Sequence, residues 1–269
     1  TPAATNSLGA NKAIIIDTTA AAPALTLAVD TGSSTSDTIT NNSLVNVSGL
    51  ETGATWQYST DAGSNWSSGT GSSFTVSGDG AKSVTVRQTD AAGNTSSAST
   101  ALAFTLDTTP PTFDAAPAAG TATAINENSG AGQTVYTAAA TDAGAITYSL
   151  KAATDDVSSF SINASTGAVT LTGNPDFETK ASYSFTVVAT DAANNASEQA
   201  VTLAINNLDE SAPTITSAAS ATAINENSGA TQVVYTATST DTIRPPPRST
   251  LFPYTAPSRA VSSFSINAS

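Results

Sequence analysis

Apolar and polar residues alternate in many short segments of this chain, and this period of two is the feature that most restricts its fold. Clusters of Gly, Asn, Asp and Ser, such as 59–66 and 90–96, separate the segments, and no stretch has a convincing helical period. Many short strands at this spacing predict an all-β fold of tandem antiparallel β-sandwich domains. The alternating apolar residues are Leu25, Leu27 and Val29; Trp56 and Tyr58; Phe74 and Val76; Val84 and Val86; Leu102, Phe104 and Leu106; Phe160 and Ile162; Val169 and Leu171; Tyr183, Phe185 and Val187; and Val201, Leu203 and Ile205.

Two kinds of internal repeat divide the chain. The first is marked by similar segments at 13–23 and 102–112, which place Asp17 and Asp107 90 residues apart (107 − 17). That distance is an ordinary sandwich length, and the Pro residues after each Asp-Thr-Thr indicate linkers. We therefore expect 1–18 to end a preceding repeat and 19–109 to form a complete one.

The second kind of repeat appears at 124–142 and again at 223–241, an offset of 99 (223 − 124). We expect a complete sandwich at 110–209 and a truncated repeat at 210–269. The segment 157–165 returns at 261–269 with an offset of 104 (261 − 157), so the second copy is longer.

Residues 242–260 account for this mismatch. They hold three of the four Arg and five of the twelve Pro residues, where the first copy has the strand containing Ile146, Tyr148 and Leu150. The segment resembles translated sequencing-adapter read-through, and the alternative is a genuine Pro-rich insertion. We expect the artefact, because the segment replaces a core strand instead of lengthening a loop.

Composition excludes several function classes. The chain has no Cys, His or Met, so it offers no thiol nucleophile, imidazole base, disulfide or Cys/His zinc site. A net charge of −13 argues against binding to nucleic acid or to anionic membranes and favours cations. No apolar run reaches the roughly 18 residues of a membrane helix. The chain does not begin with Met, and we expect both of its ends to be cuts within repeats.

The second kind of repeat resembles a bacterial cadherin-like domain. The motifs that carry the resemblance are INENSG at 125–130, ATD at 140–142, FSINASTGAVTLTGNPDFE at 160–178, YSFTVVATDAANNAS at 183–197 and VTLAINNLDESAP at 201–213. The first kind is similar to the Ig-like extender repeats of giant bacterial adhesins. There the motifs are VDTGSSTSDTIT at 29–40, WQYSTDAGSNW at 56–66, VRQTDAAGN at 86–94 and LDTTPP at 106–111.

The cadherin resemblance implies calcium at the junctions between domains. Clustered carboxylates repel one another unless a cation lies among them, and Ca²⁺ takes six to eight oxygen ligands. The junction before 110–209 would then use Asp107, Asp142 and Asp191. The junction after it would use Glu127, Asp176, Glu178, Asp209, Glu210, Ser211 and Asp241. Gly144 and Ile243 stand where the family pattern has a second Asp, which predicts fewer ions or weaker binding.

Each candidate residue also has a plainer interpretation. Isolated Asp residues commonly stabilise turns, and this is the interpretation that we prefer for Asp61, Asp79 and Asp155. Turn chemistry and calcium remain open for Asp17, Asp30, Asp37, Asp90 and Asp107 in the Ig-like repeats. Trp56 and Trp66 are expected to be core or end-covering residues and not a sugar platform. The acid pairs 155–156 and 176/178 lack a cleft-forming insertion that would favour a glycosidase.

Taken together, these features predict a non-enzymatic, extracellular segment at a cell surface. The first hypothesis is a calcium-stiffened extender of a secreted bacterial adhesin that supports cell adhesion or biofilm formation. Alternatives are direct binding of a protein or glycan partner by the cadherin-like units, and a non-catalytic accessory region of a large secreted hydrolase. Calcium is the expected cofactor and partner, and other cell-surface proteins or glycans are further candidates.

Overall fold

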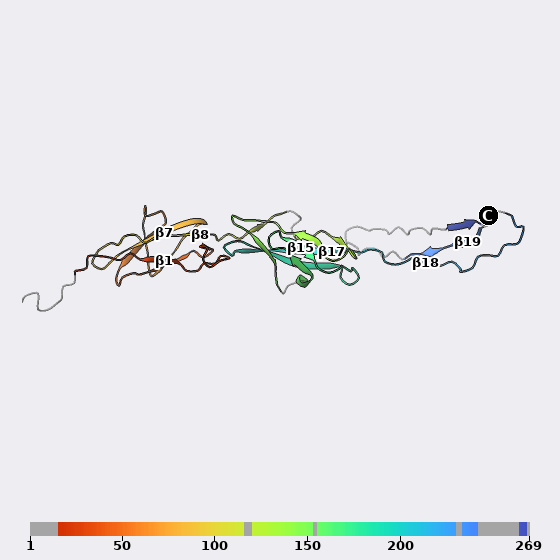
Figure 1. Ribbon diagram of the computed structural model, residues 1–269, viewed down its shortest axis with the longest axis horizontal. Helices are drawn as coiled ribbons and strands as arrows, with labels where there is room; N and C mark the ends of the chain where they lie inside the picture. The colour runs from red at the N-terminus through yellow and green to blue at the C-terminus, as the bar shows by residue number, and fades with distance from the viewer. Residues whose placement is uncertain (1–15, 116–119, 153–154, 230–232, 242–263, 268–269) are drawn as a thin grey trace, which may run out of the picture.

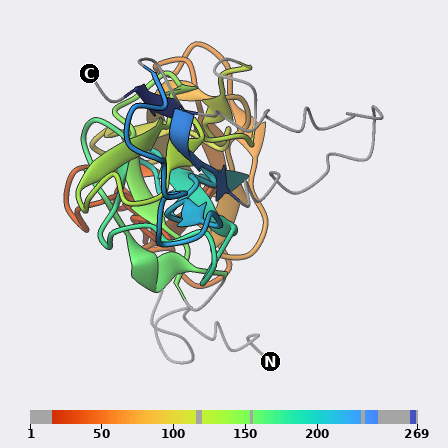
Figure 2. The same ribbon diagram turned by 90° about the vertical axis from the view of Figure 1, so that its right-hand side faces the viewer.

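A computed structural model describes residues 16–115, 120–152, 155–229, 233–241 and 264–267. Most of these residues lie in two bodies that follow one another along the long axis, with β1, β7 and β8 in the first and β15 and β17 in the second (Figure 1). Figure 2 looks along that axis and shows the narrow cross-section. The expected artefact at 242–260 lies outside the described residues.

The first body consists of two facing sheets. One has the order β1-β3-β6 and the other β2-β8-β7-β4-β5. Their strands are β1 (Ala24–Leu27), β2 (Ile39–Thr40), β3 (Leu44–Ser48), β4 (Thr55–Ser59), β5 (Ser67–Ser68), β6 (Ser73–Thr75), β7 (Gly80–Thr89) and β8 (Leu102–Leu106). The alternating side chains meet between the sheets because neighbours along a strand point to opposite faces. This core includes Val45, Trp56, Phe74, Val84 and Leu106.

The second body is again built from two main sheets, but its strand orders differ from those of the first. Its sheets have the orders β10-β17-β16-β13 and β11-β15-β14, beside a short β12-β9 pair. The described elements are β9 (Thr112–Phe113), β10 (Ile125–Asn126), β11 (Gln133–Thr137), β12 (Ala140–Thr141), β13 (Thr147–Leu150), the 3₁₀ helix η2 (Val157–Ser159), β14 (Phe160–Ile162), β15 (Ala168–Leu171), β16 (Ser182–Thr190) and β17 (Ala196–Asn206). Phe160, Val169, Phe185, Val187 and Leu203 lie in its core.

The third repeat contributes only short pairs to the described part of the chain. β18 (Thr214–Ile215) pairs with β20 (Ser239–Thr240), and β19 (Val233–Ala237) pairs with β21 (Phe264–Asn267). Ile215, Ile224 and Val233 are largely exposed there.

The predicted fold class is confirmed: the chain is all-β and contains tandem β-sandwiches. One detail differs from a purely antiparallel scheme, because β2 pairs with β8 and β10 pairs with β17 in parallel. In the first body β1 belongs to one sheet and the next strand, β2, belongs to the other, so the chain crosses between the sheets after β1. The expected boundaries at 19–109 and 110–209 stay predictions. No helix in the described ranges is long and apolar enough to cross a membrane.

Candidate metal centres

Three acidic clusters lie where a linker meets a sandwich. In each, one carboxylate oxygen from each of three residues lies within 4.8 Å of the other two. The central cluster is Asp107, Asp142 and Asp191, the C-terminal cluster is Glu127, Glu178 and Glu210, and the N-terminal cluster is Asp17, Glu51 and Asp90. In each of the three clusters, one acid belongs to the linker.

The central cluster joins the end of the first sandwich to two loops of the second. Asp107 directly follows β8, Asp142 follows β12 and Asp191 follows β16. The side-chain amide of Asn195 donates to Asp191 Oδ2 at 2.8 Å and also to the backbone oxygen of Asp107 at 2.9 Å. Asn195 therefore ties the linker to the loop that carries Asp191, which is itself only 5% exposed.

The electrostatics of the central cluster favour a cation. Burial raises the pKa of the Asp107 carboxyl, and the negative charges of Asp142, Asp191 and Asp79 raise it further. Asp142 Oδ2 is buried without a hydrogen-bond partner, which is costly for a carboxylate that nothing neutralises. Because the chain has no Cys or His, only oxygen ligands are available. Three carboxylates with a free buried oxygen fit a hard cation such as Ca²⁺.

Asp79 fixes the direction of the linker at this junction, although turn chemistry is what the sequence predicts for it. Its Oδ1 accepts hydrogen bonds from the amide and the hydroxyl of Thr108 at 3.0 and 2.9 Å. Its Oδ2 accepts from the hydroxyl of Thr109 at 2.6 Å. These contacts lower the pKa of Asp79, with the Thr109 hydroxyl as the largest cause. Asp79 is thus a clamp on the residues that follow Asp107.

The N-terminal cluster reproduces the central one. Asn94 donates to Asp90 Oδ2 at 2.8 Å and to the backbone oxygen of Asp17 at 3.1 Å, the roles that Asn195 has at the next junction. Of its three acids, Asp17 and Asp90 are open candidates in the sequence, whereas Glu51 has no motif that indicates a role. Glu51 Oε1 accepts a hydrogen bond from the amide of Ala21 at 2.8 Å. This contact with the linker exists only in the folded chain, and it is what identifies Glu51 as part of the junction.

The C-terminal cluster is organised by Glu127, which is 1% exposed. Its two oxygens accept from the amides of Leu208 at 2.6 Å and Phe177 at 2.9 Å. These bonds, with that from Leu208 the larger, lower its pKa. The other two acids are exposed, and Glu178 accepts from the side-chain amide of Asn207 at 3.1 Å while Glu210 contacts Asn128.

Three of the predicted acidic ligands do not belong to these clusters in the described chain. Asp176 accepts from the amide and hydroxyl of Thr179 at 3.1 and 2.7 Å, as a turn residue does. Asp209 accepts from the amide of Ser211 at 3.0 Å. Asp241 is exposed and lies at the edge of the described residues. Their role as ligands stays a prediction.

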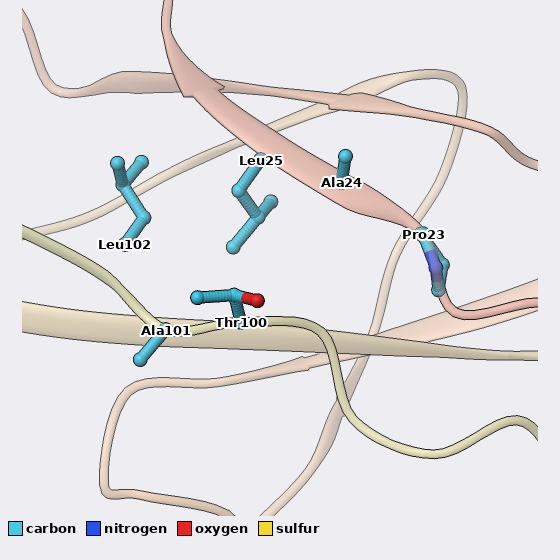
Figure 3. Close-up of a pocket in the computed structure, with 6 residues that line it drawn as sticks. All are labelled: Pro23, Ala24, Leu25, Thr100, Ala101 and Leu102. Carbon is cyan, nitrogen blue, oxygen red and sulfur yellow. The ribbon is translucent and has the colours of Figure 1, made fainter.

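The structure gives little support to a catalytic acid pair or to a sugar site on the Trp residues. Asp156 forms an ion pair with Lys180 at 2.5 Å, and this contact lowers its pKa. Trp56 is buried, and the guanidinium of Arg87 lies 4.1 Å from the Trp66 ring centroid. An open groove of about 180 Å³ lies between β1 and the start of β8 (Figure 3). It carries no ionisable side chain; its lining is Pro23, Ala24, Leu25, Thr100, Ala101 and Leu102.

One part of the chain matches a known protein family. Residues 121–206 match the cadherin domain family model. Similar solved structures include protocadherin gamma B2 extracellular cadherin domains 3–6, with 27% identity, coverage of 48% of this chain and 30% of that one, and a TM-score of 0.32. The third cadherin domain of human protocadherin 7 matches at 24% identity over 39% of this chain and 92% of that one, with a TM-score of 0.32.

The human desmocollin-1 ectodomain is a third similar structure, with 16% identity, coverage of 73% of this chain and 42% of that one, and a TM-score of 0.36. Of the first four protocadherin structures matched, the chain spans between 30% and 60% of the length. The family match and the strand arrangement agree for the second sandwich. Residues 121–206 carry a cadherin-like fold.

Proposed function

We propose that this chain is a calcium-stiffened extender segment of a secreted bacterial cell-surface adhesin, and that it is not an enzyme. The observation that carries the proposal is the placement of the acids. Each of the three clusters combines an acid from a linker with two acids from a sandwich, so a bound ion would tie the two together. The cadherin-like fold of 121–206 supports an adhesion-type extracellular module.

Stiffening follows from the geometry of these ligands. At the central cluster Asp107 would be held against Asp142 and Asp191, which belong to the next sandwich. When bound, Ca²⁺ supplies the positive charge that three converging carboxylates lack. Bending at the linker would pull a carboxylate out of the cluster. A row of such junctions would keep a terminal binding region away from the cell and so support adhesion or biofilm formation.

Calorimetric titration of the chain with CaCl₂ tests the ion site. We expect binding with a Kd of about 10⁻⁴ to 10⁻³ M, the range of extracellular calcium modules. Asp142→Asn should remove or weaken one class of site, because it neutralises the acid whose buried oxygen has no protein partner. Asp61→Asn is the matched control, since Asp61 lies in a turn outside the three clusters. No calcium heat for the unmodified chain, or equal heats for the two variants, would contradict the proposal.

A further inference from the structure

The two sandwiches also touch directly, through backbone and hydroxyl groups that no metal site requires. The turn 31–33 of the first sandwich reaches the loop 191–195 of the second. The Thr31 hydroxyl donates to the backbone oxygen of Ala193 at 3.0 Å, and the amide of Ser33 donates to the backbone oxygen of Ala192 at 3.2 Å. Ala193 is completely buried in this contact region.

Gly32 lets the two backbones come this close. A Cβ atom at position 32 would lie 3.0 Å from the backbone oxygen of Ala192 and 2.8 Å from that of Ile39. The two shortest distances, to Ile39 and to Asp37 Oδ1 at 2.9 Å, lie within the first sandwich, so a side chain at 32 would meet its own turn as well as the backbone of Ala192. The lack of a side chain at 32 thus allows both the tight turn of the first sandwich and its close approach to the 191–195 loop.

The loop that receives the turn is the one that holds the metal-site acid. Asp191 begins it and Asn195 ends it, and Asn195 donates to the linker oxygen of Asp107 at 2.9 Å. We infer that the turn 31–33 is a metal-independent latch, which docks the two sandwiches through Ala192 and Ala193 and holds the loop of Asp191 in place before an ion binds. The latch adds a second constraint on the junction and rests on the proposed function only for the role of the ion.

The position of Gly144 gives the latch a reason at this junction. The cadherin-like pattern has a second Asp there, and in this chain a Cβ at 144 would lie 3.7 Å from the Cβ of Ala192. An Asp at position 144 would therefore place its charge beside Ala192, whose backbone oxygen accepts the hydrogen bond from Ser33. A junction with fewer acids is held in part by direct hydrogen bonds, which do not depend on calcium.

The distance between two spin labels, one on each sandwich, reports whether the sandwiches are docked. The chain has no Cys, so Asn46→Cys on β3 and Ser161→Cys on β14 place one label on each sandwich at exposed sites. Pulsed electron resonance on the full chain then gives the distribution of distances between the sandwiches, in CaCl₂ and in EDTA. Circular dichroism of every variant checks that the sheets are retained.

Ser33→Pro is the main variant because it removes the amide donor that reaches Ala192. Thr31→Val removes the other donor, although Thr31 Oγ1 also accepts from the amide of Asn41 within its own sandwich. The control is the double variant Ser34→Ala and Ser36→Ala, whose hydroxyls contact each other at 3.2 Å in the segment that follows the turn.

In EDTA we expect the distribution of distances between the two labels to keep one narrow main peak for the unmodified chain and for the control. For Ser33→Pro the ratio of docked to undocked forms should fall by up to about ten-fold, as the loss of one net hydrogen bond implies. A distribution in EDTA that is as broad for the unmodified chain as for Ser33→Pro would overturn the latch, and so would equal broadening by the control. If CaCl₂ narrows the distribution in neither protein, the calcium proposal fails, while the contrast in EDTA still decides the latch.

Discussion

Three Asp-x-x-x-Asn turns in the described chain share one hydrogen-bond pattern. In each, the Asn amide and side chain donate to the two oxygens of the Asp, at 2.8 and 2.6 Å for Asp61 and at 2.8 Å for both bonds of Asp90 and Asp191. Only the last two turns also meet a linker, through Asn94 and Asn195. The turn is local chemistry, and the contact with a linker makes it part of a junction.

The C-terminal cluster gives a prediction about single acids. Glu178→Ala should weaken calcium binding about ten-fold, because it removes one of three converging charges. Asp155→Ala should be nearly silent, since Asp155 is exposed and its carboxylate contacts only the Thr186 hydroxyl at 3.4 Å among the contacts seen. Calorimetric titration compares the two variants. Equal affinities would mean that these acids do not form the junction site.

Asp61 gives a prediction about pH. Hydrogen bonds from the Asn65 amide, then from its side chain and from Ser59, lower the pKa of Asp61 to about 2. A lowered folded-state pKa stabilises the turn above the ordinary value of 3.8, and this contribution is lost as pH falls toward 2. The amide shift of Asn65 in NMR should titrate with a midpoint near 2, and Asn65→Ala should raise it. A midpoint near 4 in the unmodified chain would show that the bonds do not persist.

At the scale of single elements, the strands were the most predictable part. Val84 and Val86 on β7 and Val201 and Leu203 on β17 alternate in the sequence, and all four are buried. The short β2 and β10 strands were not predictable, because two residues carry no periodic signal. Their parallel pairing depends on where the chain crosses between sheets, which only the packed core determines.

Gly69 gives a prediction about packing in the first sandwich. A Cβ there would lie 2.3 Å from ring atoms of Trp56. This side chain is buried, and its Nε1 donates a hydrogen bond to the backbone oxygen of Gly71 at 3.0 Å. Gly69→Ala should lower the free energy of unfolding by about 1–3 kcal/mol, because the ring cannot move away freely.

Chemical denaturation tests this, and Trp fluorescence reports on the first sandwich since both Trp residues lie there. Gly173→Ala is the control: a Cβ at 173 meets open space, and we expect a change within about 0.5 kcal/mol by circular dichroism. Unchanged stability of Gly69→Ala would mean that Trp56 is not fixed as described.

At the scale of the whole molecule, the repeats indicated where acids would gather. The family register brought Asp107, Asp142 and Asp191 into one expected set, and the structure places these three together. The second expected set held Glu127, Asp176, Glu178, Asp209, Glu210, Ser211 and Asp241, of which the structure groups only Glu127, Glu178 and Glu210. Glu51 and Asp79 were beyond sequence reasoning, since each acts on a linker that is near only after folding. The contact between the turn 31–33 and the loop 191–195 joins residues about 160 apart, and no local pattern marks it.

Small-angle X-ray scattering with and without calcium tests the central claim most directly. A fragment of residues 19–210 contains both complete sandwiches and the central cluster. In CaCl₂ we expect a profile that one extended arrangement explains. In EDTA the profile should require additional arrangements beside the docked one, which stays the main form of the native sequence, while circular dichroism keeps its sheet signal because each sandwich has its own core. The latch should make this change smaller in the native sequence than in Ser33→Pro. Identical profiles in CaCl₂ and EDTA for both proteins would contradict calcium stiffening.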